Sequence, residues 1–156
     1  PSQYPEKLIP LIVLNAIHGD SLPVYGDGRQ VRNWLYVEDF CRGIHTVLMN
    51  GRPGEAYNVG GPDECENIEV VKRVIELTGG DESSIEYVQD RPGHDRRYSL
   101  ASDKLRDELG WEAQVHFAEG LERTVQWYRD NEEWWSSIRS GEYREYYEKQ
   151  YGRALG

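Results

Sequence analysis

Hydrophobic periodicity switches repeatedly between helical and strand-like spacing along this chain, and this alternation restricts the fold more than any other feature. Strands that alternate with helices build layered α/β or α+β domains. We therefore expect a mixed α/β fold with a small sheet and several helices. Helical spacing covers residues 7–18, 38–50, 67–78, 102–109 and 118–131, and strand-like composition covers 22–25, 30–37, 56–59 and 85–88.

Local signals predict where several of these elements begin and turn. Pro10 is tolerated only in the first turn of a helix, so the first helix should begin near Lys7. Asp27-Gly28 between two strand-like runs predicts a β-hairpin. Asn67 and Ser102 are the expected N-caps of two later helices.

The size and charge of the chain limit its partners. The 156 residues suffice for one domain, predicted over 1–156, with a helical, aromatic-rich tail at 132–156. The sequence holds 28 acidic against 18 basic residues, a net charge of -10, so nucleic acid and anionic membranes are not expected partners. An anionic ligand therefore needs a local concentration of cations.

Cysteine usage and hydropathy indicate a cytoplasmic protein. Cys41 and Cys65 form no CxxC pair and are best interpreted as two unpaired thiols. No apolar run reaches the roughly 18 residues of a membrane span, and no segment resembles a signal peptide.

Familiar catalytic motifs are absent from the sequence. Gly26-Asp27-Gly28 lies between strand-like runs and not at a helix start, so it is not a dinucleotide fingerprint. There is no phosphate-binding Walker loop, nucleophile elbow or metalloprotease histidine pair. We therefore predict no catalytic, cofactor-binding or metal-binding residue in this chain.

The segment Asp90-Arg91-Pro92-Gly93-His94-Asp95-Arg96-Arg97-Tyr98 concentrates positive charge in an otherwise acidic chain. Arginine guanidinium groups bind phosphate oxygens in a bidentate manner, and Pro-Gly gives a tight turn. The segment could therefore bind a diphosphate. A solvated loop with internal ion pairs explains the same composition.

A second candidate lies in Pro23-Val24-Tyr25 and the nearby Arg32. Tyrosine beside proline forms a flat platform on which a nucleobase can stack, with Arg32 close enough to reach an attached phosphate. A surface arginine on an edge hairpin is the alternative. Lys7, near a helix N-terminus, is a weaker candidate of the same kind.

Taken together, these segments resemble the dTDP-glucose 4,6-dehydratase family of the extended short-chain dehydrogenase/reductase group. The resemblance runs from about Pro5 to Tyr128, and the 90–98 loop is its most specific part. Its segments are Pro5-Glu6-Lys7-Leu8-Ile9-Pro10, Val31-Arg32-Asn33-Trp34-Leu35-Tyr36-Val37-Glu38-Asp39, Tyr57-Asn58-Val59-Gly60-Gly61 and Asp90 to Tyr98.

The resemblance implies a role for each candidate residue. Lys7 and Leu8 would line the substrate site, and Pro23, Val24 and Tyr25 would contact the thymidine end. Arg32, Asn67 and Arg91 would hold the diphosphate. The substrate-wrapping loop would consist of Asp90, Arg91, Pro92, Gly93 and His94.

The resemblance also implies that this chain is the C-terminal substrate-binding portion of a larger enzyme. The Rossmann half, which in the family binds NAD and carries the Tyr-x-x-x-Lys pair, would be a missing partner. We expect the fragment to bind no NAD and to be inactive alone, and the full-length enzyme to be a homodimer. Alternatives are the substrate domain of another nucleotide-sugar epimerase, dehydratase or decarboxylase, or a non-catalytic nucleotide-sugar-binding module.

Overall fold

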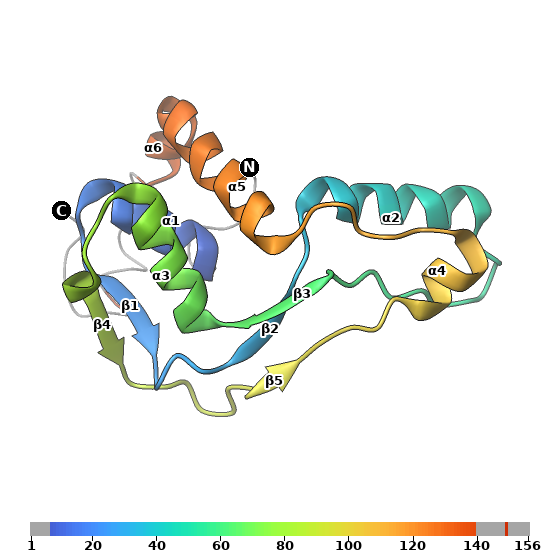
Figure 1. Cartoon of the computed structure of the whole chain (residues 1–156), viewed down its shortest axis with the longest axis horizontal. Helices are drawn as coiled ribbons and strands as arrows, with labels where there is room; N and C mark the ends of the chain where they lie inside the picture. The colour runs from blue at the N-terminus through green and yellow to red at the C-terminus, as the bar shows by residue number, and fades with distance from the viewer. Residues whose placement is uncertain (1–6, 140–148, 150–156) are drawn as a thin grey trace.

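The computed structural model describes residues 7–139 and 149 and has the expected mixed α/β architecture (Figure 1). In chain order the elements are α1 (Leu8–His18), β1 (Leu22–Tyr25), β2 (Val31–Trp34), α2 (Val37–Asn50), β3 (Asp63–Glu66), α3 (Asn67–Thr78), the 3-10 turn η1 (Glu82–Ser84), β4 (Ile85–Val88), β5 (Arg97–Tyr98), α4 (Asp103–Leu109), α5 (Phe117–Asp130) and α6 (Glu132–Arg139).

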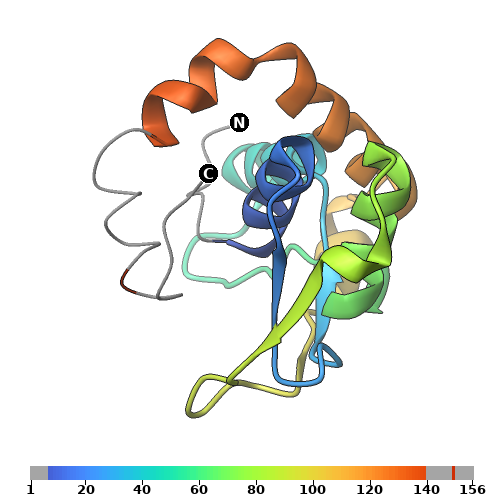
Figure 2. The ribbon, with the colours of Figure 1, turned by 90° about the vertical axis from the view of Figure 1, so that its left-hand side faces the viewer.

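The hydrophobic core lies where α1, α3 and α5 pack beside the parallel strands β1 and β4 (Figure 2). Helix α1 is apolar on nearly every side, which suits a helix enclosed by the core. The buried cluster contains Ile12, Val13, Leu14, Leu22, Val24, Val71, Val74, Ile75, Leu121, Val125, Tyr128 and Trp135.

The predicted β-hairpin is wrong, although its turn forms. β1 pairs in parallel with β4, whereas β2 pairs antiparallel with β3 and parallel with β5. The backbone N–H of Gly28 donates to the Tyr25 carbonyl at 3.1 Å. Gly28 has φ 71°, and a Cβ there would lie 2.8 Å from a methyl of Val24, so the turn requires glycine. The turn carries the chain from one sheet to the other.

The predicted helix starts are partly confirmed. Lys7 is the N-cap of α1, as expected. Asn67 is not a cap but the first residue of α3, because Glu66 and Glu69 form a capping box around that helix start. Ser102 occupies the N-cap position of α4, but its hydroxyl accepts the Gly60 N–H at 2.6 Å and caps no helical N–H.

The strand predicted at 56–59 is also wrong. These residues have no strand partner in the described part of the chain, and Ala56 and Asn58 are exposed. A strand needs a neighbour to satisfy its backbone groups, and β2 is already paired on both sides. Hydrophobic composition alone could not reveal this.

The first part of the aromatic tail is helical and packs on the core. Trp135 is buried, donates its indole N–H to the Tyr128 carbonyl at 2.7 Å and meets His18 edge to face. Trp135 therefore serves packing, as a buried aromatic with a satisfied N–H usually does. The tyrosines at 143, 146, 147 and 151 lie outside the described residues.

Asp39 ties α2 to the segment that leads into α5. Its buried carboxylate accepts the backbone N–H groups of Gln114 and Val115 at 2.9 and 2.8 Å and pairs with Arg42. Burial alone would raise the pKa of Asp39, but the Arg42 guanidinium and the two N–H donors outweigh it and hold that pKa below its ordinary value of 3.8. The ionised form therefore stabilises the fold.

We predict that Asp39→Asn lowers the free energy of unfolding by about 2 kcal/mol, because it weakens hydrogen bonds to a buried charge. Since the folded pKa is depressed, this contribution is present above the ordinary carboxyl pKa and is lost as pH falls through the folded value. Urea unfolding of both proteins at pH 7 and pH 3 measures it.

The matched control is Asp103→Asn, which removes an exposed partner of Arg106 on α4 and should change stability little. Equal effects of the two substitutions would contradict a structural role for Asp39.

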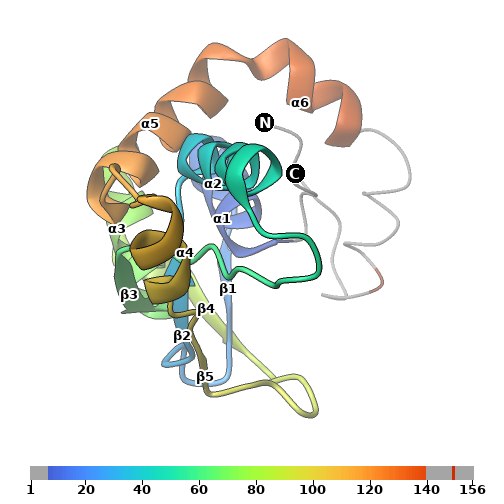
Figure 3. The same ribbon diagram turned by 90° about the vertical axis from the view of Figure 1, so that its right-hand side faces the viewer.

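Helix α2, whose position is seen in Figure 3, carries a row of exposed apolar side chains. Val37, Phe40, Ile44 and Leu48 recur at helical spacing with exposed fractions of 48, 44, 50 and 79%. Such a row favours association with another surface.

None of the helices among the described residues, α2 included, combines the length and apolar character needed to cross a membrane.

We therefore predict that the isolated chain is marginally stable or self-associates through α2. Sedimentation velocity should show a mass that rises with concentration, and Leu48→Gln should reduce that rise. Leu100→Gln, at another exposed leucine outside α2, should not. A monomer at every concentration with a sharp, reversible melt would contradict the prediction.

Candidate functional site

The predicted ligand loop and the β1–β2 turn lie side by side at one end of the molecule (Figures 1 and 2). β1 and β4 end in register, with Tyr25 opposite Val88, so both connections leave the same end of the sheet. Two backbone bonds join them: Gly26 N–H donates to Val88 O at 2.9 Å, and Val31 N–H to Arg96 O at 2.8 Å. The two candidate segments of the sequence thus lie side by side and make up one candidate site.

Asp90 links the loop to the turn through both of its carboxylate oxygens. Oδ2 accepts from Gln30 Nε2 at 3.0 Å. Oδ1 accepts the Arg91 backbone N–H at 2.8 Å and His94 Nδ1 at 2.6 Å. The hydrogen bond from His94, with smaller help from Arg91 and Gln30, holds the pKa of Asp90 below its ordinary value. Asp90 therefore stays ionised and acts as an acceptor within the loop.

A second, exposed contact joins the same two segments. Arg96 NH1 donates to both carboxylate oxygens of Asp27, at 2.8 and 3.0 Å. This hydrogen bond is the main reason that the pKa of Asp27 lies below its ordinary value. Because both side chains are more than half exposed, the pair adds little stability by itself.

Two tyrosines in this region, Tyr25 and Tyr98, are each covered by an arginine. The Arg91 guanidinium lies 5.3 Å from the centre of the Tyr25 ring, and the Tyr25 and His94 rings meet edge to face. Arg32 lies 4.2 Å over Tyr98 and donates to Asp95 O at 2.9 Å. Cations held over aromatic faces place charge and stacking surface in one small region.

The structure limits what some predicted residues can do. The side chain of Val24 belongs to the core, so only its backbone faces the loop region, and Pro23 is buried beside it. The His94 side chain is only 5% exposed, so it supports the loop from beneath. Lys7 is exposed at the start of α1, and Leu8 is partly buried against the core.

The N-terminus of α3 offers no open anion site. The N–H groups of Asn67 and Ile68 donate to the turn carbonyls of Gln30 and Gly28 at 3.0 and 2.9 Å. Glu66 caps a further N–H. Asn67 Oδ1 is buried and has no hydrogen-bond partner. Any contact of Asn67 with a ligand must therefore come through its side-chain amide.

Sequence reasoning missed three residues of this site: Asp27, Gln30 and Tyr98 were not assigned roles of their own. Gln30 could not be found from the sequence, because its role depends on Asp90, sixty positions away. Tyr98 ends the quoted loop, and its pairing with Arg32 follows from the β2–β5 register. The pattern of alternating side chains gave no sign of that pairing.

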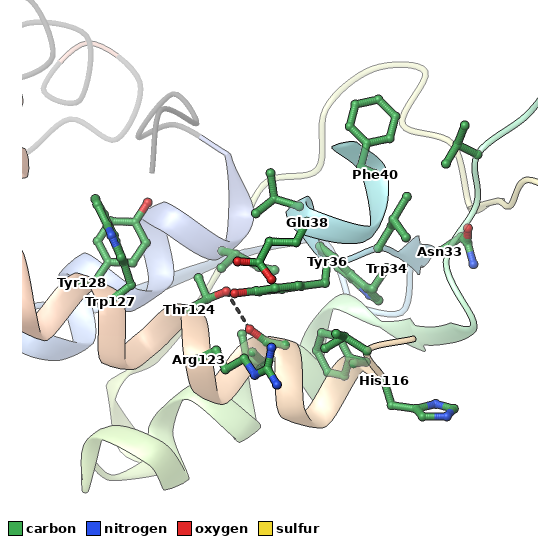
Figure 4. Close-up of a pocket in the computed structure, with 18 residues that line it drawn as sticks. Asn33, Trp34, Tyr36, Glu38, Phe40, His116, Arg123, Thr124, Trp127 and Tyr128 are labelled. Atoms are coloured by element: carbon green, nitrogen blue, oxygen red, sulfur yellow. Dashed lines mark hydrogen bonds between the residues drawn. The ribbon is translucent and has the colours of Figure 1, made fainter. Parts of the chain in front are cut away.

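A cavity of about 930 Å³ lies elsewhere, between α5 and the connection from β2 to α2 (Figure 4). Tyr36 reaches across it toward Thr124, and Trp127 and Tyr128 close one end. Its cation Arg123 is paired with Glu119. None of the twelve predicted ligand residues lines it, and its aromatic walls do not provide the several cations that a diphosphate needs.

A second cavity, of about 720 Å³, adjoins the Gly60-Gly61 turn. Its arginines, Arg97 and Arg106, are bound to Glu64 and Asp103. Within the part of the chain that the structure describes, no group of three metal-ligating side chains occurs. The turn and loop around Tyr25 thus remain the strongest candidate site.

Comparison with known proteins assigns the class. Residues 1–124 match the family model described as GDP-mannose 4,6 dehydratase, and the chain belongs to this family. A structure of UDP-glucose 4-epimerase from Thermotoga maritima, solved with UDP-glucose, has TM-score 0.77 at 29% identity over 83% of this chain and 42% of the epimerase.

Comparison with dTDP-glucose 4,6-dehydratases confirms the resemblance that the sequence shows. It is 51% identical over 153 residues to that of Xanthomonas campestris pv. campestris and 47% identical over 160 residues to that of Shigella flexneri. These alignments cover 92 and 97% of this chain but 44% of each relative, so the chain spans less than half of their length. The enzyme from Bacillus anthracis, in complex with NAD, has TM-score 0.84 at 54% identity over 88% of this chain and 44% of that one.

Proposed function

We propose that this chain supplies the dTDP-sugar-binding portion of an NAD-dependent dTDP-glucose 4,6-dehydratase. The observation that carries the proposal is that the arginine-rich 90–98 loop is joined to the turn that follows Tyr25. This joining places an aromatic face and two arginines within one short span. Thymine stacking and diphosphate binding require that combination.

Each residue of the site has its own proposed role in binding. Tyr25 offers its ring to the base, and Arg91 and Arg32 offer guanidinium N–H groups to the diphosphate. Asp90 and His94 hold the loop in shape. Lys7, Leu8 and Asn67, together with the backbone of Pro23 to Tyr25, complete the proposed contacts. Pro92 and Gly93 form its tight bend, where Gly93 has φ 70°.

The described residues do not fit NAD. The turn at Gly26 and Gly28 connects two strands and opens no helix, and a Cβ on Gly26 would already meet Asp90 Oδ2 at 2.9 Å. Dinucleotide-binding folds hold the NAD pyrophosphate with free N–H groups at a helix start, which this turn does not offer. We therefore assign the chemistry and the cofactor to a dinucleotide-binding half.

The surface for that half is proposed on α2. Its apolar row continues into the large cavity at Val37 and Phe40, which line the cavity and are exposed. Docking there would cover both features at once. The proposal extends to a cytoplasmic enzyme that is a homodimer when complete.

We predict that dTDP binds to this chain more tightly than UDP or GDP, because stacking on the half-buried Tyr25 ring favours the pyrimidine that carries an extra methyl group. Isothermal titration with the three nucleotides tests this. Arg91→Ala should weaken dTDP binding about tenfold by removing a charge-assisted contact.

Arg73→Ala is the matched control, because Arg73 is an exposed arginine on α3 that pairs with Glu76. It should leave dTDP affinity unchanged. Equal affinity for the three nucleotides would favour another nucleotide-sugar enzyme, and equal loss from both arginine variants would exclude a specific site.

We also predict that the chain with dTDP-glucose and NAD forms no 4-keto product. Binding without a cofactor site cannot remove a hydride. The alkaline absorbance of 4-keto-6-deoxy sugars measures the product, and turnover by the purified chain would contradict the proposal.

A further inference from the structure

Gln30 is a buried polar side chain at the centre of the candidate site. It is 2% exposed, and its Nε2 donates to Asp90 Oδ2 at 3.0 Å. Its Oε1 is also buried but has no hydrogen-bond partner. An unpaired buried acceptor is unfavourable, so a residue that keeps one calls for a reason beyond packing. A leucine or methionine would fill this space without that cost.

We propose that Gln30 is a positioning residue that acts through Asp90 to hold the 90–98 loop in its ligand-binding conformation. The inference rests on the proposed function for the identity of the ligand. The positioning itself is a property of the chain without ligand. The role is distinct from that of Arg91 and Tyr25, because Gln30 is too deeply buried to touch a nucleotide.

Gln30 connects the loop to a rigid element. Its backbone carbonyl accepts the Asn67 N–H at 3.0 Å, at the first residue of α3. Its side chain then fixes one oxygen of Asp90. A side chain whose backbone is anchored to a helix positions its partner more accurately than a loop residue can. The connection therefore runs from α3 through Gln30 to Asp90.

Gln30 also determines which way the Asp90 carboxylate faces. With Oδ2 held by Gln30, Oδ1 is left to accept from Arg91 N–H and His94 Nδ1. Since a carboxylate only accepts, His94 must carry its proton on Nδ1. The His94 and Tyr25 rings in turn meet edge to face, with 6.2 Å between their centres. Loss of the Gln30 bond frees the carboxylate to rotate and releases both contacts.

The first measurement needs no ligand. Nitrogen chemical shifts of the His94 imidazole, assigned with a His94→Gln variant, should show one tautomer with the proton on Nδ1. Gln30→Leu should give a mixture of the two tautomers, whereas the matched control Gln126→Leu should not. Gln126 also donates to an aspartate, Asp130 at 2.8 Å, but on the exposed side of α5. Identical His94 spectra in all three proteins would overturn the proposal.

The second measurement is a double-mutant cycle on dTDP affinity. Gln30→Leu should weaken binding about tenfold in the unchanged chain and less than twofold in Asp90→Ala, because the glutamine acts through the aspartate. Its melting temperature should stay equal or rise. Equal weakening in both backgrounds, or a lower melting temperature that accounts for the loss, would show a merely structural role.

Two further results keep the inference separate from the proposed function. If the unchanged chain binds no dTDP, the proposed function fails, and the His94 tautomer comparison alone decides the role of Gln30. If Gln30→Leu does not fold, Gln30→Met, which keeps an unbranched chain of similar length, replaces it in both measurements. A Met variant with unchanged tautomer and affinity would overturn the proposal.

Discussion

The candidate site depends on the parallel pairing of β1 with β4. Because Tyr25 lies opposite Val88 in that register, the two strands end together, and the segments that follow them emerge side by side. A slip of one residue would turn every side chain of β4 to the other face of the sheet and move Asp90 away from Gln30. The core formed by α1, α3 and α5 specifies the register, because it requires Leu22 and Val24 to face inward.

The candidate site has a local charge that differs from the charge of the whole protein. The chain has a net charge of -10, yet its loop presents cations because two aspartates are used internally. Asp90 is occupied by His94 and Gln30, and Asp27 by Arg96. Lowered pKa values keep both carboxylates ionised in the same role. Arg91 and Arg32 lie over tyrosine rings, so the two aspartates organise the loop and the turn, and we propose that these two arginines bind the phosphates.

Sequence reasoning found the helices and singled out the two candidate segments, but it did not show how these parts come together. Apolar spacing sufficed for α2, α3 and α5, because each has one strongly apolar side. It failed at β1 and β2, where Asp27-Gly28 gives the same local signal whether a turn closes a hairpin or passes between sheets. It also failed at Ala56 to Val59, where composition shows strand propensity and no partner exists among the described residues. Gln30 has no local signal, since its partner is distant in sequence.

The segment from Val31 to Asp39 shows why a contiguous motif need not have one role. Arg32 turns toward the 90–98 loop and lies over Tyr98, whereas the Asn33 side chain forms hydrogen bonds with both the carbonyl and the N–H of Gly61. At the other end Asp39 is buried and joins α2 to the approach of α5. The alternation of β2 sends neighbouring side chains to opposite faces, and the helix that follows changes the direction again. One short run of sequence thus links the 90–98 loop, the turn at Gly61 and α2, and a change at Asp39 acts on the candidate site only through the fold.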